Sequence, residues 1–225
     1  MTDVAAPKTT TYHHGNLREV LIQAAVQLVE EVGLEHVSVR EVAKRAGVSP
    51  GAPFRHFSNK TALMTAVAEQ AMTKFRAEIT KAADSVAADD PVGRFAAVGV
   101  GYLHWAIQNP TYFQIISTRS LIDWQASESL RRDNEAVRVM MESALIEAQR
   151  RGMLRSSNLV DTQIAGRALV YGLARMYIDG HFAQWGIDGE KAERTTQKVL
   201  RHFMSLVENA EGVSPKETES APGKA

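Results

Sequence analysis

The stretch "SVREVAKRAGVSPGAPFRHFSNK", residues 38–60, decides the architecture of the N-terminal part of this chain. Ser38 and Glu41 have the spacing of a capping box, in which each side chain bonds the other residue's backbone N–H where a helix begins. Gly47 fits the left-handed position that ends such a helix. Pro50 then suits the first position of another helix, where its missing N–H costs nothing. The stretch therefore predicts two short helices joined by a tight turn, as in a helix-turn-helix.

A further helix is predicted upstream, because apolar residues recur at spacings of three and four from Leu17 to Val32. Asn16 and Glu19 have the spacing of a capping box at its start, and Gly33 is placed to end it. We therefore expect residues 16–57 to form a three-helix unit that presents the start of its third helix outward. The free N–H groups of a helix start carry a partial positive charge, which suits a phosphate.

The charges of the chain are unevenly distributed, although its 225 residues have a formal net charge of +0. Between residues 40 and 60, five basic side chains stand against one acid. A local basic surface on a neutral protein predicts a localised anion site, and beside a helix-turn-helix pattern the expected anion is DNA. The residues expected to contact DNA are Arg40, Lys44, Ser49, Pro50, Gly51, Ala52, Phe54, Arg55, His56 and Lys60.

These residues have different expected roles. The small and rigid segment 50–52 is predicted to approach the floor of a DNA groove closely, and Arg55 is the best-placed reader of base edges. Arg40 and Lys44, four residues apart on one helix face, are expected with Lys60 on backbone phosphates. Two alternatives remain open: a helical subdomain with a solvated basic surface, and a helical adaptor that binds an acidic protein partner.

The N-terminal stretches resemble the DNA-binding domain of the TetR/AcrR family of transcriptional regulators over residues 16–75. The resemblance is carried by "NLREVLIQAAVQLVEEVG", "SVREVAKRAGVS" and "FRHFSNKTALM". Three positions depart from the family pattern. Phe54 stands where a tyrosine is usual and lacks the hydroxyl that touches a phosphate, Pro53 replaces a bulky apolar residue, and Thr61 replaces an acid.

Glycine and proline divide the rest of the chain into helix-length pieces, and strand-like alternation is scarce. We expect an all-α protein of about nine helices, with a three-helix helix-turn-helix DNA-binding domain followed by a larger helical ligand-binding and dimerisation domain. The predicted boundaries place the DNA-binding domain at 12–60 and the larger domain at 61–210. The segments 1–11 and 211–225 are predicted to be disordered tails, because the latter is rich in Pro, Ser, Glu and Lys.

The family resemblance implies that the protein is a repressor. It also implies that a small, largely apolar effector binds in the second domain and releases the protein from its operator. Aromatic residues and methionines gather between residues 85 and 182, and such side chains line apolar pockets. Arg175 and Asp179 are four residues apart, so a simple surface pair is the alternative there. The residues predicted to form the pocket are His104, Trp105, Phe113, Met140, Met141, Tyr171 and Arg175.

The last two long helices are predicted to form a homodimer, so that two recognition helices meet a palindromic operator in double-stranded DNA. The stretch "ALVYGLARMYIDGHF" is also similar to a C-terminal subgroup of the family with a Trp-His-Gly signature, although Val170 and Tyr171 precede Gly172. The alternative is that both helices pack only within one protomer. The predicted interface residues are Ala165, Ala168, Gly172, Val199, Leu200 and Phe203.

Composition and missing motifs exclude several classes of protein. The absence of cysteine excludes disulfides and thiolate metal sites, and it is compatible with a cytoplasmic location. No run of about 18 apolar residues suggests a membrane span. The patterns of serine hydrolases, phosphate loops and zinc proteases are missing, so neither an enzyme nor a cofactor is expected. His13 and His14 are adjacent without a third ligand nearby, so no metal site is predicted.

Overall fold

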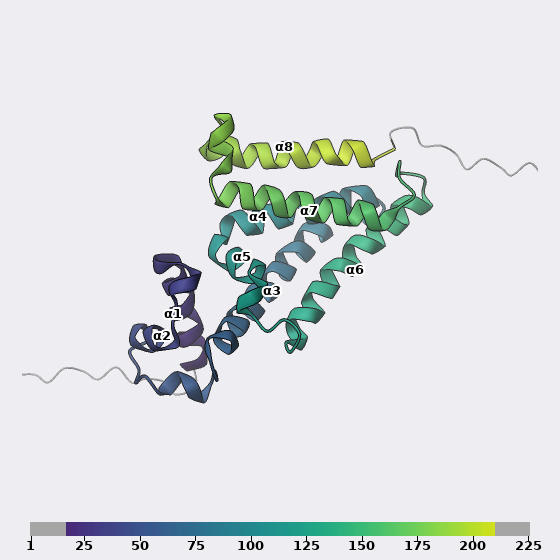
Figure 1. Ribbon diagram of the computed structural model, residues 1–225. Helices are drawn as coiled ribbons and strands as arrows, with labels where there is room; N and C mark the ends of the chain where they lie inside the picture. Colours follow the sequence, from purple (N-terminus) through teal and green to yellow (C-terminus); the bar gives the residue numbers. More distant parts are fainter. Residues whose placement is uncertain (1–16, 210–225) are drawn as a thin grey trace, which may run out of the picture.

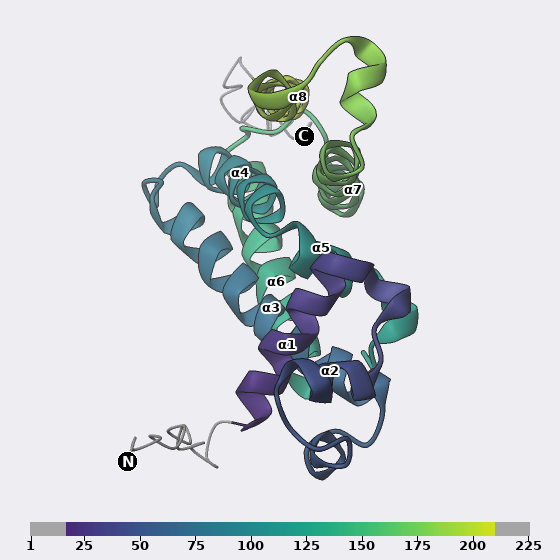
Figure 2. The ribbon, with the colours of Figure 1, turned by 90° about the vertical axis from the view of Figure 1, so that its left-hand side faces the viewer.

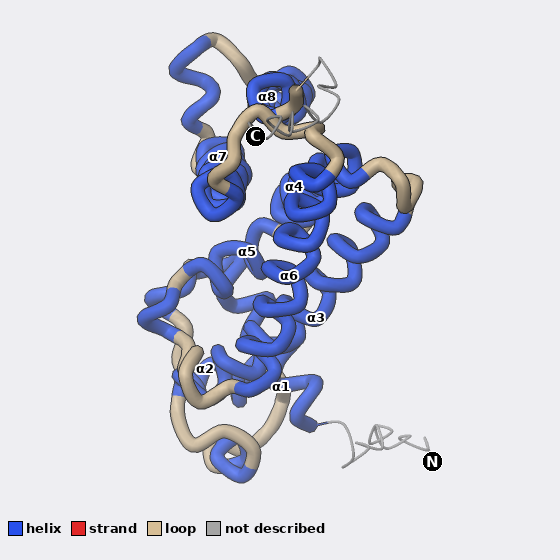
Figure 3. Tube along the Cα trace, turned by 90° about the vertical axis from the view of Figure 1, so that its right-hand side faces the viewer, coloured by secondary structure: helices blue, strands red, loops and turns tan. Residues whose placement is uncertain are grey.

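Helices and the loops between them make up the whole fold of residues 17–209, the part of the chain that the computed structural model describes (Figure 1; Figure 3). The all-α prediction is confirmed. The predicted tails, the His13–His14 pair and the Asn16 cap lie outside the described residues. The eight α-helices within them are α1 (Leu17–Val32), α2 (Val39–Arg45), α3 (Lys60–Asp84), α4 (Pro91–Gln108), α5 (Pro110–Ser117), α6 (Glu128–Arg150), α7 (Leu159–Ile178) and α8 (Gly189–Val207).

Local hydrogen bonds fix the ends of α2 as the sequence predicts. The Ser38 hydroxyl accepts the Glu41 N–H, and the Glu41 carboxylate accepts the Ser38 N–H at 3.1 Å, which completes the capping box. At the other end, Gly47 has a φ of 68°, the Val48 N–H donates to the Ala43 carbonyl, and the Gly47 N–H donates to the Lys44 carbonyl. This is a Schellman motif, and its left-handed residue turns the chain sharply toward the next element.

The predicted third helix is shorter than an α-helix and consists of the 3-10 turn η2 (Ala52–Arg55). Proline explains the difference. In an α-helix the N–H of residue 53 would donate to the carbonyl of Ser49, but Pro53 has no N–H. The Ser49 carbonyl instead accepts the Ala52 N–H at 3.0 Å, the three-residue spacing of a 3-10 helix. The cap residue of η2 is Gly51, without a side-chain cap, so Pro50 precedes the turn and is not at its first position as the sequence predicts.

Helix α3 is shared by the two parts of the molecule. Its first turns pack on α1, and its later turns pack on α4, α5 and α6 (Figure 2). The predicted boundary between residues 60 and 61 therefore falls at the first residue of this shared helix. The cap of α3 is Asn59, whose side chain accepts the Ala62 N–H at 2.8 Å.

The larger part is built on α3, α4 and α6, with α5 closing one side and the pair α7–α8 at the end away from α1 and α2 (Figure 1). Three aromatic rings link its core. Phe75 of α3 contacts Tyr102 and Trp105 of α4 edge to face, at centroid distances of 5.2 and 5.0 Å. Such pairs add roughly 0.5–1.5 kcal/mol each beyond their buried area. None of the helices within residues 17–209 is both long and apolar enough to cross a membrane.

Candidate nucleic-acid interface and ligand cavity

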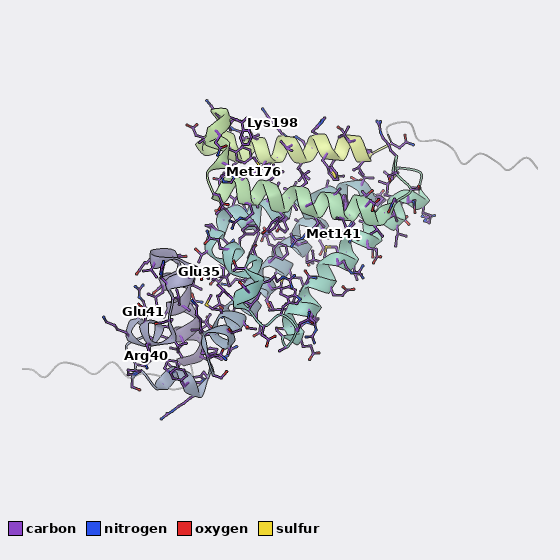
Figure 4. The ribbon with its side chains drawn as sticks, in the orientation of Figure 1. Glu35, Arg40, Glu41, Met141, Met176 and Lys198 are labelled. Carbon is purple, nitrogen blue, oxygen red and sulfur yellow. The ribbon has the colours of Figure 1, made fainter. Side chains whose placement is uncertain are left out.

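Three basic side chains of the helix-turn-helix are exposed and available to an anion. Arg40 and Lys44 lie on α2, and Arg55 lies at the end of η2. Arg40 is at the outer edge of the N-terminal unit in Figure 4. None of the three forms an ion pair with another residue between 17 and 209. Their charge is therefore directed to solvent, as a phosphate-binding surface requires.

Two further basic residues of the segment 40–60, Arg45 and Lys60, already bond other groups of the protein. Arg45 forms a two-pronged ion pair with Glu31 of α1, with one N–O distance of 2.6 Å. This hydrogen-bonded pair lowers the pKa of the Glu31 carboxyl and raises that of Arg45. The Lys60 ammonium donates to the carbonyls of Leu34 and Glu35, each at 3.1 Å, and so ties α3 to the loop before α2. Three of the five basic side chains between residues 40 and 60 therefore remain for a basic surface.

The leading edge of the unit has the smooth surface that its sequence predicts. Ser49, Pro50 and Gly51 are exposed, and Ala52 is partly exposed. Pro53 is buried, whereas the Phe54 ring is 51% exposed and His56 is exposed beside Arg55. A four-residue 3-10 turn has too few aligned peptide units for an appreciable dipole. The helix start that the sequence predicts as a phosphate site is therefore not formed, and the positive charge of this edge is on its side chains.

A cavity of about 240 Å³ opens between the helices of the larger part. Helices α3, α4, α5, α6 and α7 border it, together with the 3-10 turn η3 (Arg119–Leu121) and the loop that follows it. The wall combines aromatic and polar side chains, as in sites that bind organic molecules. The lining residues are Met72, Phe75, Tyr102, Ile116, Ser117, Arg119, Trp124, Asn134, Arg167 and Tyr171.

Two arginines from different elements border this cavity. The Arg119 guanidinium lies over the Trp124 ring at 3.5 Å from its centroid, and the Arg167 guanidinium lies 4.6 Å from the centroid of Tyr102. Both contacts are cation–π interactions. Partial burial, and then the neighbouring charge of Arg167, lower the pKa of Arg119. Burial raises the pKa of the Tyr102 phenol, so this hydroxyl remains a hydrogen-bond donor at neutral pH.

Two further cavities adjoin through shared walls. One, of about 410 Å³, lies between α6 and α7 and shares Phe75, Asn134 and Arg167 with the first. The other, of about 20 Å³, is apolar, reaches α8 and also includes Arg167. Arg167 therefore lines all three cavities. No signal in the sequence singled it out except that no acid lies three or four residues away on its helix.

The structure brings only some of the predicted pocket residues to these cavities. Tyr171 lines the first, and Met141 lines the other two from its place between α6 and α7 (Figure 4). Trp105 and Phe113 are buried behind the wall, in contact with Phe75 and Tyr102.

Three of the predicted pocket residues lie elsewhere. His104 is exposed on α4, although its neighbours Leu103 and Trp105 are both buried. Met140 lines a separate recess between α3, α4 and α6. Arg175 pairs with Asp179 at 2.9 Å, the alternative that the sequence left open.

The outer face of α7 carries exposed small and apolar side chains. Gly172 faces open space, since a Cβ built there meets nothing within 4 Å. Leu200 of α8 is instead a core residue, 4% exposed, whose two methyl groups would lie 3.1 and 3.2 Å from a Cβ on Gly99. Its predicted place in a dimer interface is therefore wrong. Val199 and Phe203 are partly exposed beside it. The exposed small and apolar residues along α7 are Val160, Ile164, Ala165, Ala168 and Tyr171, of which Val160, Ile164 and Tyr171 also line the cavities.

A loop connects the cavity wall to the first half of α3. This loop, residues 118–127, carries Arg119 and Trp124 on the cavity side. The Asp123 N–H donates to the Thr65 hydroxyl at 2.8 Å, and the Ser127 hydroxyl donates to Glu69 at 2.7 Å. Glu69 also lies 3.8 Å from Arg18 of α1. A contiguous set of contacts thus runs from the cavity through α3 to α1 of the three-helix unit.

Two family models match this chain, one in its N-terminal part and one in its C-terminal part. Residues 21–67 match the family model described as "Bacterial regulatory proteins, tetR family". Residues 95–203 match "Tetracyclin repressor-like, C-terminal domain". The likeness to a Trp-His-Gly subgroup stays a prediction.

Curated proteins and solved structures agree with this assignment. Tetracycline repressor protein class C of Escherichia coli is 43% identical over 56 residues, 25% of this chain and 26% of that protein. The uncharacterized HTH-type transcriptional regulator YvdT of Bacillus subtilis (strain 168) is 38% identical over 55 residues, 24% and 28% of the two chains. The chain thus spans about a quarter of the length of these relatives.

A solved structure extends the likeness of fold to nearly the whole chain. The structure of a protein with unknown function from Rhodococcus sp. RHA1 superposes with a TM-score of 0.72 at 24% identity. The superposition covers 89% of this chain and 100% of that chain.

Proposed function

Because this chain belongs to the TetR family of bacterial regulatory proteins, which are not enzymes, we propose that it is a sequence-specific transcriptional repressor that a small effector releases from its operator. The observation that carries the proposal is the set of exposed, unpaired cations on the helix-turn-helix, joined through α3 to a solvent-open cavity. Such a protein works beside the chromosome, so we also propose a cytoplasmic location.

The proposed DNA contacts follow from exposure and charge. Arg55 extends from the end of η2 and reads base edges, while Arg40 and Lys44 hold backbone phosphates. Ser49, Pro50 and Gly51 form the close-fitting edge, with Ala52, Phe54 and His56 behind it. Lys60 acts by positioning, because its ammonium already bonds two backbone carbonyls. Selection from a random duplex library tests the proposal, and a palindromic consensus is the expected result.

Operator binding should depend strongly on salt concentration. Each protomer offers three cations, so a dimer neutralises about six phosphates. Each neutralised phosphate releases about one counterion. The slope of log K against log salt is then about −5. Fluorescence anisotropy with the selected duplex between low and moderate salt measures it. A slope near zero would mean that Arg40, Lys44 and Arg55 do not meet the backbone, and it would favour a protein partner instead.

We propose that the effector acts through the loop 118–127. A ligand that moves Arg119 or Trp124 displaces the loop, and the loop bonds α3 at Thr65 and Glu69 near the DNA-binding unit. Tilting α3 changes the separation of the two Arg55 side chains in a dimer. A coupling of about 2.7 kcal/mol weakens DNA binding roughly a hundredfold, within the usual range, and reciprocity requires the operator to weaken effector binding equally.

The Thr65→Val protein tests this route. The change removes the hydroxyl that accepts the Asp123 N–H but keeps the shape of the side chain. Calorimetry of effector binding with and without saturating operator should show the coupling fall from about a hundredfold to a few-fold. Effector affinity without DNA should stay unchanged.

Thr195→Val is the matched control, because the Thr195 hydroxyl bonds only the Lys191 carbonyl within α8. Coupling that persists in Thr65→Val, or that is lost equally in both variants, would reject the loop as the connection.

A further inference from the structure

We propose that the cavity bordered by α3, η3 and α7 selects an anionic ligand, a small carboxylate with an aromatic or aliphatic body, through the guanidinium groups of Arg119 and Arg167. The inference deepens the effector role proposed above and rests on it. It concerns the chemistry of the ligand, which can be measured without DNA.

The two guanidinium groups form an uncompensated positive site. Both border the same cavity, and neither forms an ion pair with any acid in the described part of the chain. Two arginines on helices that border the cavity, one on α6 and one on α7, do have acid partners. Arg138 of α6 pairs with Glu135 and Glu142, and Arg175 of α7 pairs with Asp179. The Arg119 guanidinium instead lies on the face of Trp124, which leaves the edges of its planar group free for an acceptor. The Arg167 guanidinium lies over the Tyr102 ring and also hydrogen-bonds the Tyr102 hydroxyl, and its remaining N–H groups can meet an acceptor.

Mutual repulsion favours an anion between them. The charge of Arg167 contributes to the lowered pKa of Arg119, so the two positive charges act on each other. A carboxylate placed between them replaces this repulsion by charge-assisted hydrogen bonds, which a planar guanidinium can make in pairs. Both arginines are exposed at the cavity mouth, so the ligand's charged end can reach them from solvent.

The walls behind the arginines define the body of the ligand. Phe75, Met72 and Ile116 supply apolar surface, and Trp124 and Tyr171 supply further rings. A cavity of about 240 Å³ holds one small ring system or a short chain, and the adjoining cavity of about 410 Å³ can accept a longer one. An anionic end and an apolar body therefore each have a matching surface.

Matched pairs of carboxylates and carboxamides test the inference. The probes are 2-naphthoate with 2-naphthamide and decanoate with decanamide, which have nearly the same shape but differ in charge. Binding to the full-length protein is followed by calorimetry and by tryptophan fluorescence, because Trp124 lies under Arg119. At least one carboxylate should bind roughly 10- to 100-fold more tightly than its amide, the usual strength of hydrogen bonds to charged groups. That preference should shrink as salt rises.

Single and double arginine variants assign the preference. Arg119→Gln and Arg167→Gln should each lower the carboxylate-to-amide ratio roughly tenfold, and the double variant should bring it close to one. Arg175→Gln is the control, because it removes the same charge from α7 at a residue that pairs with Asp179. Amide binding should stay unchanged in every variant, which shows that the cavity remains intact.

Several results would overturn the inference. If no carboxylate binds better than its amide, or if the ratio survives in the double variant, the cavity does not select anions. If Arg167→Gln weakens dimerisation and leaves the ratio unchanged, its guanidinium belongs to a contact with a second copy. A carboxylate that binds selectively but leaves the operator complex intact would contradict the effector role and not the ligand class. A neutral ligand that releases the protein from DNA, with no preference for charge, would contradict the ligand class and not the effector role.

Discussion

The Gly172→Arg protein is expected to be monomeric and to lose most of its operator affinity. We propose that the exposed face of α7, with Val199 and Phe203 of α8, packs on the same face of a second protomer. Gly172 lies within this face, where an arginine would hold two helices apart. A dimer joins two half-site contacts, and losing that linkage costs roughly 10²–10⁴-fold in affinity. Analytical ultracentrifugation and anisotropy with the selected duplex measure both effects.

The substitution should leave the protomer itself intact. A Cβ at Gly172 meets no atom within 4 Å, and arginine favours a helix more than glycine does, by roughly 1 kcal/mol. Ala77→Arg provides the control, because it adds the same side chain to an exposed position of α3. That variant should remain dimeric and bind the operator. A wild-type protein that is monomeric at micromolar concentration, or a Gly172→Arg monomer that binds normally, would contradict the proposed interface.

The second large effect is expected from Arg55→Ala. One bidentate contact to a base is worth about 1–3 kcal/mol of discrimination, so two protomers together lose about 2–6 kcal/mol. Specific affinity should fall by roughly 30-fold to 10⁴-fold, and binding to unrelated duplex should fall much less. Competition between the selected duplex and a scrambled one gives the specificity ratio directly.

Lys44→Ala is the matched comparison, because Lys44 is equally exposed but is proposed to hold only phosphate. It should weaken both duplexes alike and reduce the magnitude of the salt slope by about two in the dimer, one unit for each protomer. Equal, sequence-independent losses for Arg55→Ala and Lys44→Ala would reject Arg55 as the reader of bases. Lys60 is unsuited to this comparison, since removing its ammonium also removes two bonds to backbone carbonyls.

The family comparisons constrain fold more than ligand. The curated relatives match over about a quarter of their length, and the solved Rhodococcus structure at 24% identity shows the fold alone. The proposed ligand class therefore rests on the cavity of this chain, which Arg119 and Arg167 both line.

The sequence by itself determined the helical fold and the local geometry of the helix-turn-helix. The Ser38–Glu41 capping box and the turn at Gly47 are confirmed, because their hydrogen bonds join residues at most five positions apart. Spacing within one helix also marked the exposed face of α7 that contains Gly172. Even the shortness of the third helix follows from a local fact, the missing N–H of Pro53.

Only the tertiary structure decided which charged side chains lack a partner within the protein and which apolar side chains are exposed. Lys60 bonds carbonyls 26 and 25 positions away, and Arg45 bonds Glu31 14 positions away, so neither engagement is visible in a local pattern. Leu200 and Phe203 share a helix edge, yet Leu200 fills the core. Arg119 and Arg167 meet at one cavity although they are far apart in the chain. The packing of whole helices sets these contacts, and it depends on the shapes of all their faces together.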